Sequence, residues 1–281
     1  MKTLLRFTVV LCVRNEQSRL PECLEMLSHV GADEIIVVDG GSEDKTWPLL
    51  KEYQNVLAVE AGRVGLLKQR VLGVKMSRNE LVALVNVDDH FSPDALSVGF
   101  TEMLAAPDLS GLQMGISSPN RTYWERCWSA YFRAIARPFE SIKLLGRPAL
   151  AYRRNFVDIE PPSGIFNEDT WIHLRERSAK RQYRVSSSSA VRSCPLSLQE
   201  NIRQFMRYGV SDYSCTQSKA DTFRLLIHSG LRIPIVRSWI FLKNGDGIYI
   251  PFLLLLGSVR TLSHILSRIR STNRFSATKE R

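Results

Sequence analysis

Two short apolar runs in the first hundred residues each end in carboxylates. Residues 35–38 (IIVV) precede Asp39, and residues 81–87 precede the pair Asp88 and Asp89. Continuous apolar runs of this length are typical of strands that are buried on both faces of a parallel sheet. In an open α/β sheet, ligands bind outside the carboxyl ends of the strands. The pattern therefore predicts that both carboxylate groups lie at the ligand-binding edge of one sheet.

These two strand tips also predict the kind of ligand. Carboxylates at one tip can bond to a ribose or a base, and those at the other can hold a divalent metal through hard oxygen ligands. A bound Mg²⁺ or Mn²⁺ would stabilise the negative charge that builds on phosphate oxygens when a diphosphate leaves. The sequence thus favours a site for a nucleoside diphosphate bridged by a metal ion.

Strand-like and helix-like periodicities alternate along the first half of the chain. We predict strands at residues 7–13, 35–38, 56–59 and 81–87, and helices that begin near residues 20, 46, 64 and 93. This order predicts an α/β fold with a mostly parallel sheet and helices on both faces. A length of 281 residues suits one large α/β domain with a tail. We assign residues 1–225 to that domain and residues 226–281 to a helical tail.

The net charge of +10 is concentrated in the tail. The last fifty residues hold nine Lys or Arg residues against two acidic ones, around apolar runs at 233–242 and 247–259. This arrangement favours an anionic membrane surface over nucleic acid, for which a basic face studded with aromatic residues is expected. The run 247–259 is shorter than the ~20 residues of a spanning helix. We interpret the tail as one or two amphipathic or re-entrant helices at a membrane interface, with a helical hairpin packed on the domain or in a dimer as the alternative.

The five cysteines show no Cys-x-x-Cys spacing, which fits a reducing compartment better than a disulfide framework. The apolar start of the chain is interrupted by Arg6 and lacks a small-residue cleavage site, so it is interpreted as a strand rather than a signal peptide. Together with the basic tail, these features predict a cytoplasmic protein that lies peripherally on the inner face of the membrane.

Five short blocks resemble those of the family 2 glycosyltransferases and occur in the same order. They are residues 13–16 (VRNE), 38–46 (VDGGSEDKT), 86–89 (NVDD), 167–169 (NED) and 204–208 (QFMRY). The resemblance covers residues 7 to about 210. It implies a GT-A fold, a nucleotide-sugar donor, a divalent cation and inverting transfer of one sugar to a lipid-linked or glycan acceptor.

The resemblance also implies roles for residues at the nucleotide. It assigns the base and ribose pocket to Val13, Asn15, Glu16 and Asp39, with Asp39 on a base that is usually uracil. Asp39 could instead form the turn before Gly40. Arg70 falls near the nucleotide by the same resemblance, with a solvated helix face as the alternative.

At the metal, Asp88 matches the last position of the family's Asp-x-Asp motif, the direct ligand. The first position is Asn86, a departure that brings no charge to the metal, although Asn86 can still bond to the ribose of the donor. His90 lies where related synthases carry a metal-reaching Gln, so it is either a ligand or a solvated loop histidine. An imidazole ligand would shift the preference towards Mn²⁺.

For catalysis, the resemblance makes Asp169 the general base, with Glu168 beside it at the donor or acceptor. The alternative is that both acidic residues only open a helix. Gln204 and Arg207 belong to a block in which Tyr208 replaces the family's Trp, which leaves Arg207 as the partner of the diphosphate or the acceptor. The several long spanning helices of processive synthases are missing, which favours transfer of a single sugar.

Two other functions remain open from the residues. A nucleotidyltransferase would want a Gly-rich, basic phosphate loop after the first strand, whereas residues 14–17 (RNEQ) lack glycine. A non-catalytic binding protein on a decayed transferase fold is encouraged by Asn86 and Tyr208. A Rossmann dehydrogenase is disfavoured because no Gly-x-Gly-x-x-Gly follows the first strand.

Overall fold

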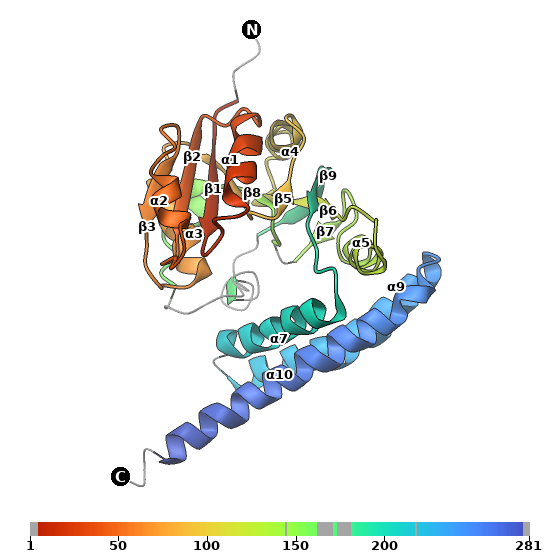
Figure 1. Ribbon diagram of the computed structural model, residues 1–281. Coiled ribbons are helices and arrows are strands. Elements are labelled where there is room, and N and C mark those ends of the chain that lie inside the picture. The colour runs from red at the N-terminus through yellow and green to blue at the C-terminus, as the bar shows by residue number, and fades with distance from the viewer. Residues whose placement is uncertain (1–4, 144, 162–170, 173–180, 217, 278–281) are drawn as a thin grey trace. The chain divides into compact units, whose positions relative to one another are not determined.

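The structure is a computed structural model that describes residues 5–143, 145–161, 171–172, 181–216 and 218–277 (Figure 1). Contacts divide the chain into two compact units. Unit 1 comprises Met1–Ser117 and Ala136–Ser193, and unit 2 comprises Ser118–Ile135 and Cys194–Arg281. The domain boundary predicted after residue 225 lies inside helix α8 (Lys219–Ile227) of unit 2.

Unit 1 is built on one mixed sheet with the strand order β3-β2-β1-β4-β8-β6-β9-β5, and β7 pairs with β9 beside this path. Its strands are β1 (Phe7–Val13), β2 (Glu34–Asp39), β3 (Leu57–Glu60), β4 (Leu81–Val85), β5 (Asp89–His90), β6 (Gly111–Ser117), β7 (Ser141–Ile142), β8 (Ala149–Tyr152) and β9 (Tyr183–Arg192). The four predicted strands are present and mutually parallel. Val13 is in register with Asp39, so the carboxyl ends of β1 and β2 meet at one edge.

Helices cover both faces of this sheet. On one face, Val9 and Leu11 of β1 pack with Leu24 of α1 and Phe100 of α4. On the other face, Val10 of β1 packs in one cluster with Val74 of α3. The helices are α1 (Leu20–Ser28), α2 (Thr46–Leu50), α3 (Leu66–Met76) and α4 (Ala95–Leu104), and a short 3₁₀ turn η1 spans Arg153–Asn155. The predicted α/β fold with helices on both faces is confirmed.

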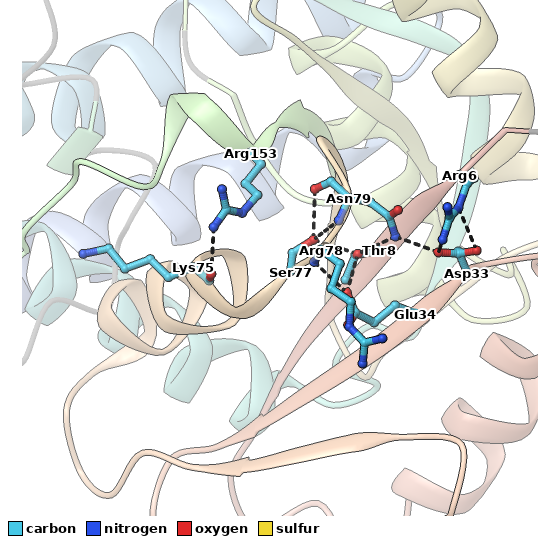
Figure 2. A network of polar contacts seen from close by, with 9 residues as sticks. All are labelled: Arg6, Thr8, Asp33, Glu34, Lys75, Ser77, Arg78, Asn79 and Arg153. Atoms are coloured by element: carbon cyan, nitrogen blue, oxygen red, sulfur yellow. Dashed lines mark hydrogen bonds and ion pairs between the residues drawn. The ribbon is translucent and has the colours of Figure 1, made fainter.

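The edge at which the parallel strands begin is closed by a polar network (Figure 2). The Thr8 hydroxyl donates to Glu34 Oε2 at 2.8 Å and accepts from the Ser77 hydroxyl at 2.7 Å. The Asn79 amide donates to both Thr8 Oγ1 and Asp33 Oδ2 at 3.1 Å. Because the members of this network satisfy one another's polar atoms, the network ties β1, β2 and the α3–β4 connection together. The opposite edge, where these strands end, is therefore the one left for a ligand.

Unit 2 is helical. It contains α5 (Tyr123–Ile135), α7 (Leu198–Cys215), α8, the π-helix η2 (His228–Arg237), α9 (Ser238–Lys243), the short η3 (Gly247–Tyr249) and α10 (Ile250–Ala277). Ser197 and Glu200 form a capping box at the start of α7. The Trp128 ring of α5 packs on Phe205 of α7 and Phe252 of α10. The predicted apolar helical tail is confirmed, and α10 extends well beyond the run 247–259.

At Gly73 the backbone of α3 approaches the sheet closely, which provides a test of this packing. A Cβ at Gly73 would lie 2.5 Å from Val10 Cγ1 and 3.1 Å from Val38 Cγ2. We expect Gly73→Val to lower the free energy of unfolding by ~2–3 kcal/mol, because both neighbours are held in the sheet. Urea unfolding followed by circular dichroism measures this. Lys75→Val on the exposed side of the same helix is the control, and equal stability of the two variants would contradict the packing.

Candidate functional site

The connections after β1 and β2 are joined to each other at the carboxyl edge of the sheet. The Asn15 N–H donates to Ser42 Oγ at 2.9 Å, and the Glu43 N–H donates back to Asn15 Oδ1 at 2.8 Å. The Glu16 N–H donates to the hydroxyl of Thr46 at 2.8 Å. Asn15 has a φ of 57°, a left-handed conformation that Asn tolerates better than most residues. The two predicted blocks therefore form one double-loop platform.

Asp39 is buried within this platform. Its Oδ2 accepts from the N–H groups of Gly41 and Ser42 at 3.1 and 3.0 Å, and its Oδ1 accepts from the Ser42 hydroxyl. The carbonyl of Val13 accepts from the Gly40 N–H at 2.9 Å. Asp39 thus has the turn-forming role that was the alternative assignment. A carboxylate offers about four acceptor positions, so these three bonds leave room for a base contact, which stays a prediction.

Arg70 is buried on α3 beneath the end of β4. Its guanidinium donates to the Val85 carbonyl at 3.3 Å and to Asn86 Oδ1 at 2.6 Å. The alternative of a solvated helix face for Arg70 is wrong. The amide of Asn86, the residue that departs from the family motif, is consequently held by a fixed cation at the tip of β4.

The neighbouring carboxylates Asp88 and Asp89 lie in different environments. Asp89 is fully buried, and its Oδ1 accepts from Arg192 Nε at 2.7 Å while its Oδ2 accepts from the Asn86 N–H at 3.0 Å. The Asp88 side chain is 30% exposed, and its Oδ1 lies 4.0 Å from Arg192 Nε. Asp89 therefore closes the turn after β4, and Asp88 is left as the accessible carboxylate of the pair.

Burial and neighbouring carboxylates raise the pKa of two carboxylates at this edge, Asp88 and Glu16. Burial raises the pKa of Asp88, Arg192 counteracts this effect, and the adjacent Asp89 carboxylate adds to it. Burial likewise raises the pKa of Glu16; Arg19 opposes the shift, and Asp88 contributes to it. Because the Asp88 carboxylate contributes to the raised pKa of Glu16, the ends of β1 and β4 bring these two carboxylates within electrostatic reach of each other. Partly desolvated carboxylates in such a cluster gain from a bound cation.

The residues present fit a divalent cation held mainly through oxygen. Mg²⁺ in nucleotide sites takes one or two carboxylates and completes its shell with phosphate oxygens and water. Asp88 can supply such a carboxylate. Among the residues that the structure describes, no group of three or more His, Cys, Asp or Glu is placed to hold a metal. His90 Nε2 lies 3.4 Å from Ser193 Oγ and His90 Nδ1 lies 4.0 Å from Glu22, so its role as a ligand stays a prediction.

Sequence reasoning missed Arg192, which ends β9 and pairs with Asp89 in the β5–β9 ladder. Besides Asp89 it contacts the carbonyl of Arg147, to which it donates at 2.9 Å. Its partner Asp89 lies 103 positions away, and β5 has only two residues. No local periodicity could have placed the two side chains together, because β9 itself was not predicted from the sequence.

The remaining predicted site residues belong to unit 2 or lie outside the described residues. Gln204 and Arg207 lie on α7 of unit 2, where the Arg207 guanidinium donates to Gln204 Oε1. Glu168 and Asp169 lie outside the described residues. The catalytic and acceptor roles of these four residues stay predictions.

Comparisons with known proteins agree with this fold. The model of the family "Glycosyl transferase family 2" matches residues 8–158, more than half of the chain. Among solved structures, the fold is similar to the mannosyltransferase PcManGT from Pyrobaculum calidifontis in complex with GDP-Man and Mn²⁺, at 13% identity and a TM-score of 0.63, with 93% of this chain and 86% of that chain covered. It is also similar to S. aureus TarS 1-349, at 15% identity and a TM-score of 0.52 over 96% and 92% of the two chains.

A third similar structure is mannosyl-3-phosphoglycerate synthase from Rubrobacter xylanophilus, at 15% identity and a TM-score of 0.52 over 80% and 75% of the two chains. At such identities these likenesses show the fold. The family model spans the part of the sheet edge that β1, β2 and β4 form, and Arg192 of β9 lies beyond it.

Proposed function

This chain belongs to glycosyl transferase family 2, and we propose that it moves one sugar from a nucleoside diphosphate sugar to an acceptor with inversion at the anomeric carbon. Its glycosyltransferase character and GT-A fold follow from the family. The proposal adds a UDP-linked donor, a metal-assisted reaction with an Asp general base, and a hydroxyl or phosphate of a lipid-linked or glycan acceptor.

One observation carries the proposal: an accessible carboxylate, Asp88, lies beside the double-loop platform at the carboxyl edge of the sheet. The turn around Asp39 and the loop around Glu16 would orient the base and ribose, and Asp88 would face the diphosphate. The bond between Arg70 and Asn86 supports this arrangement, because it fixes the turn that carries Asp88. A site that is rigid before binding loses less entropy when the donor binds.

Asp88 would hold Mn²⁺ or Mg²⁺ with the donor phosphates, and PcManGT, which was solved with Mn²⁺, supports that choice. When bound, the ion supplies Lewis-acid stabilisation of the leaving diphosphate. Arg207 would add positive charge at the diphosphate or the acceptor. Asp169 would take the proton from the acceptor hydroxyl while the oxygen of that hydroxyl attacks the anomeric carbon. Glu168 precedes Asp169 in the sequence and would contact the donor or the acceptor.

A donor screen tests the proposal. We expect hydrolysis or transfer with one nucleotide class among UDP-, GDP- and TDP-sugars, loss of turnover with EDTA and recovery with Mn²⁺ or Mg²⁺. UDP-sugars are the predicted class. Turnover of GDP-sugars alone would contradict the UDP-linked donor and leave the rest of the proposal standing. PcManGT was solved with a donor of the GDP type. Nucleotide binding without turnover of any donor would instead support a decayed binding protein.

The acceptor and location follow from the tail. A lipid-linked acceptor is met at a membrane surface, so the enzyme would act as a peripheral protein on the cytoplasmic face. By length and composition alone, two helical segments of the described chain could cross a membrane: Lys219–Lys243 and Gly247–Arg270. Core helices of soluble proteins pass the same test. The exposure and charge of the side chains are therefore needed to distinguish a spanning helix, a helix at the membrane surface and a core helix.

A further inference from the structure

The segment Lys219–Lys243 carries an apolar stripe that the rest of unit 2 leaves exposed. Its members are spaced four residues apart, and each is between 40% and 65% exposed. We call these residues the outer stripe: Phe223, Ile227, Leu231, Ile235 and Trp239. Only 22% of the apolar window of this segment is buried. A core helix of a soluble protein would be mostly buried, so this surface requires another partner.

The backbone keeps the outer stripe on one face. In an α-helix, a step of four residues overshoots a full turn by about 40°. The middle of the segment is the π-helix η2, whose i→i+5 bonds make a wider turn, so that the same step falls short of a full turn. The two deviations offset each other along α8, η2 and α9. Residues spaced by four therefore stay aligned over the whole segment.

The opposite face of η2 is fixed on α10. A Cβ at Gly257 of α10 would lie 2.7 Å from the Ser229 carbonyl and 3.0 Å from Pro234 Cδ. The Thr261 hydroxyl donates to Ser229 Oγ at 3.0 Å. Figure 1 shows α10 running beside α7 within the same unit. Because the inner face is packed this closely, the outer stripe cannot turn inward without breaking unit 2.

The charges beside the outer stripe are basic. Lys219, Arg224, Arg232 and Lys243 are exposed, whereas Asp221, the one acidic residue of the segment, is buried. Lys243 Nζ lies 3.6 Å from the centroid of the Trp239 ring. An apolar face flanked by Arg and Lys, with an aromatic residue near one end, matches the chemistry of an anionic lipid surface.

We propose that the outer stripe lies in the plane of an anionic bilayer, inserted at the boundary between headgroups and acyl chains. This inference rests on the proposed function, to which it adds the partner: an anionic phospholipid surface. Arg232 decides against a spanning segment, because it lies in the middle of the 25 residues and would reach the bilayer centre. In the plane, Arg224 and Arg232 can both pair with phosphate groups while the outer stripe is buried.

Vesicle flotation of the full chain tests the proposal. We expect binding to vesicles of phosphatidylcholine with phosphatidylglycerol and much weaker binding to phosphatidylcholine alone. Leu231→Glu with Ile235→Glu should reduce binding at least ~10-fold, because two charges enter the inserted face. Arg224→Gln with Arg232→Gln should remove most of the preference for phosphatidylglycerol. Leu104→Glu, an exposed apolar position on α4 of unit 1, is the control and should bind like the parent.

Four outcomes would overturn the proposal. The first is a full chain that floats with neither vesicle, and the second is a stripe variant that floats like the parent. The third is a bound protein that resists carbonate extraction, which would mean a spanning segment. A lipid-free dimer that Leu231→Glu with Ile235→Glu dissociates would assign the outer stripe to a second copy instead. Calorimetry with UDP and Mn²⁺ tests the proposed function separately from membrane binding. Vesicle binding without nucleotide binding would contradict only the proposed function.

Discussion

Asp88→Asn is expected to abolish the metal-dependent part of UDP binding while the fold stays intact. The Asp88 side chain is partly exposed and lies 4.0 Å from Arg192 Nε. Asn has the same shape but no charge, so it is a poor ligand for a hard cation. Changing a residue that only supports a metal ligand typically costs 10–100-fold in affinity, so losing the ligand itself should cost ~10²-fold or more. Calorimetry with UDP, with Mn²⁺ and with EDTA, measures this.

Asp89→Asn is the matched control, because it makes the same chemical change one residue away. Asp89 is buried and paired with Arg192, so its neutralisation should lower the free energy of unfolding by about 3 kcal/mol. Its effect on metal-dependent UDP affinity should be smaller than that of Asp88→Asn. Thermal unfolding and calorimetry together separate the two carboxylates. Undiminished metal-dependent affinity in Asp88→Asn would end the assignment of Asp88 to the metal.

The sequence predicted β1 to β4 because burial on both faces makes each of them a continuous apolar run. It did not predict β9, whose centre is the polar run 186–189. There the Ser186 hydroxyl donates to Glu102 Oε2 and the Ser188 hydroxyl to the Ala95 carbonyl, each at 2.7 Å. Hydroxyls satisfied by a distant helix can line a partly buried strand, and no periodicity in the strand itself reveals that.

The extent of α10 was underestimated for a related reason. Arg260 ended the uncharged run in the sequence and made a long apolar helix look interrupted. In the structure, the Arg260 guanidinium donates to both oxygens of Asp212 on α7, at 2.6 and 2.9 Å. A charge neutralised by a bidentate partner is tolerated inside a helix pair, so α10 continues to Ala277. A pairing 48 positions apart is again set by the fold and not by local sequence.

In the site, a difference between the adjacent carboxylates Asp88 and Asp89 could be expected from the sequence, but the contact that produces it could not. Successive side chains of an extended segment point in opposite directions, and Asp88 and Asp89 accordingly differ in exposure. Arg192 holds Asp89 inward, and it lies at the end of β9, a strand that was not predicted from the sequence. The turn role of Asp39 was foreseen as an alternative, because Asp followed by Gly-Gly satisfies its own backbone in a turn.

Asp169→Asn should lower the transfer rate by ~10²-fold or more and leave UDP affinity nearly unchanged. A general base meets the acceptor proton mainly in the transition state, so its loss appears in turnover and not in donor binding. The substitution keeps the shape of the side chain and removes only its basic carboxylate. Steady-state kinetics with the donor found in the screen, alongside calorimetry with UDP, give the two quantities.

The pH profile of this variant distinguishes a base from a residue that merely supports the fold. In the parent, turnover should fall at low pH as the base becomes protonated, and Asp169→Asn should lose that limb along with most of its rate. Asp158→Asn neutralises an exposed carboxylate of unit 1 and should keep both the rate and the profile of the parent. If Asp169→Asn transferred sugar at close to the parent rate, the base would lie elsewhere, and Glu168 and Asp169 would only open a helix.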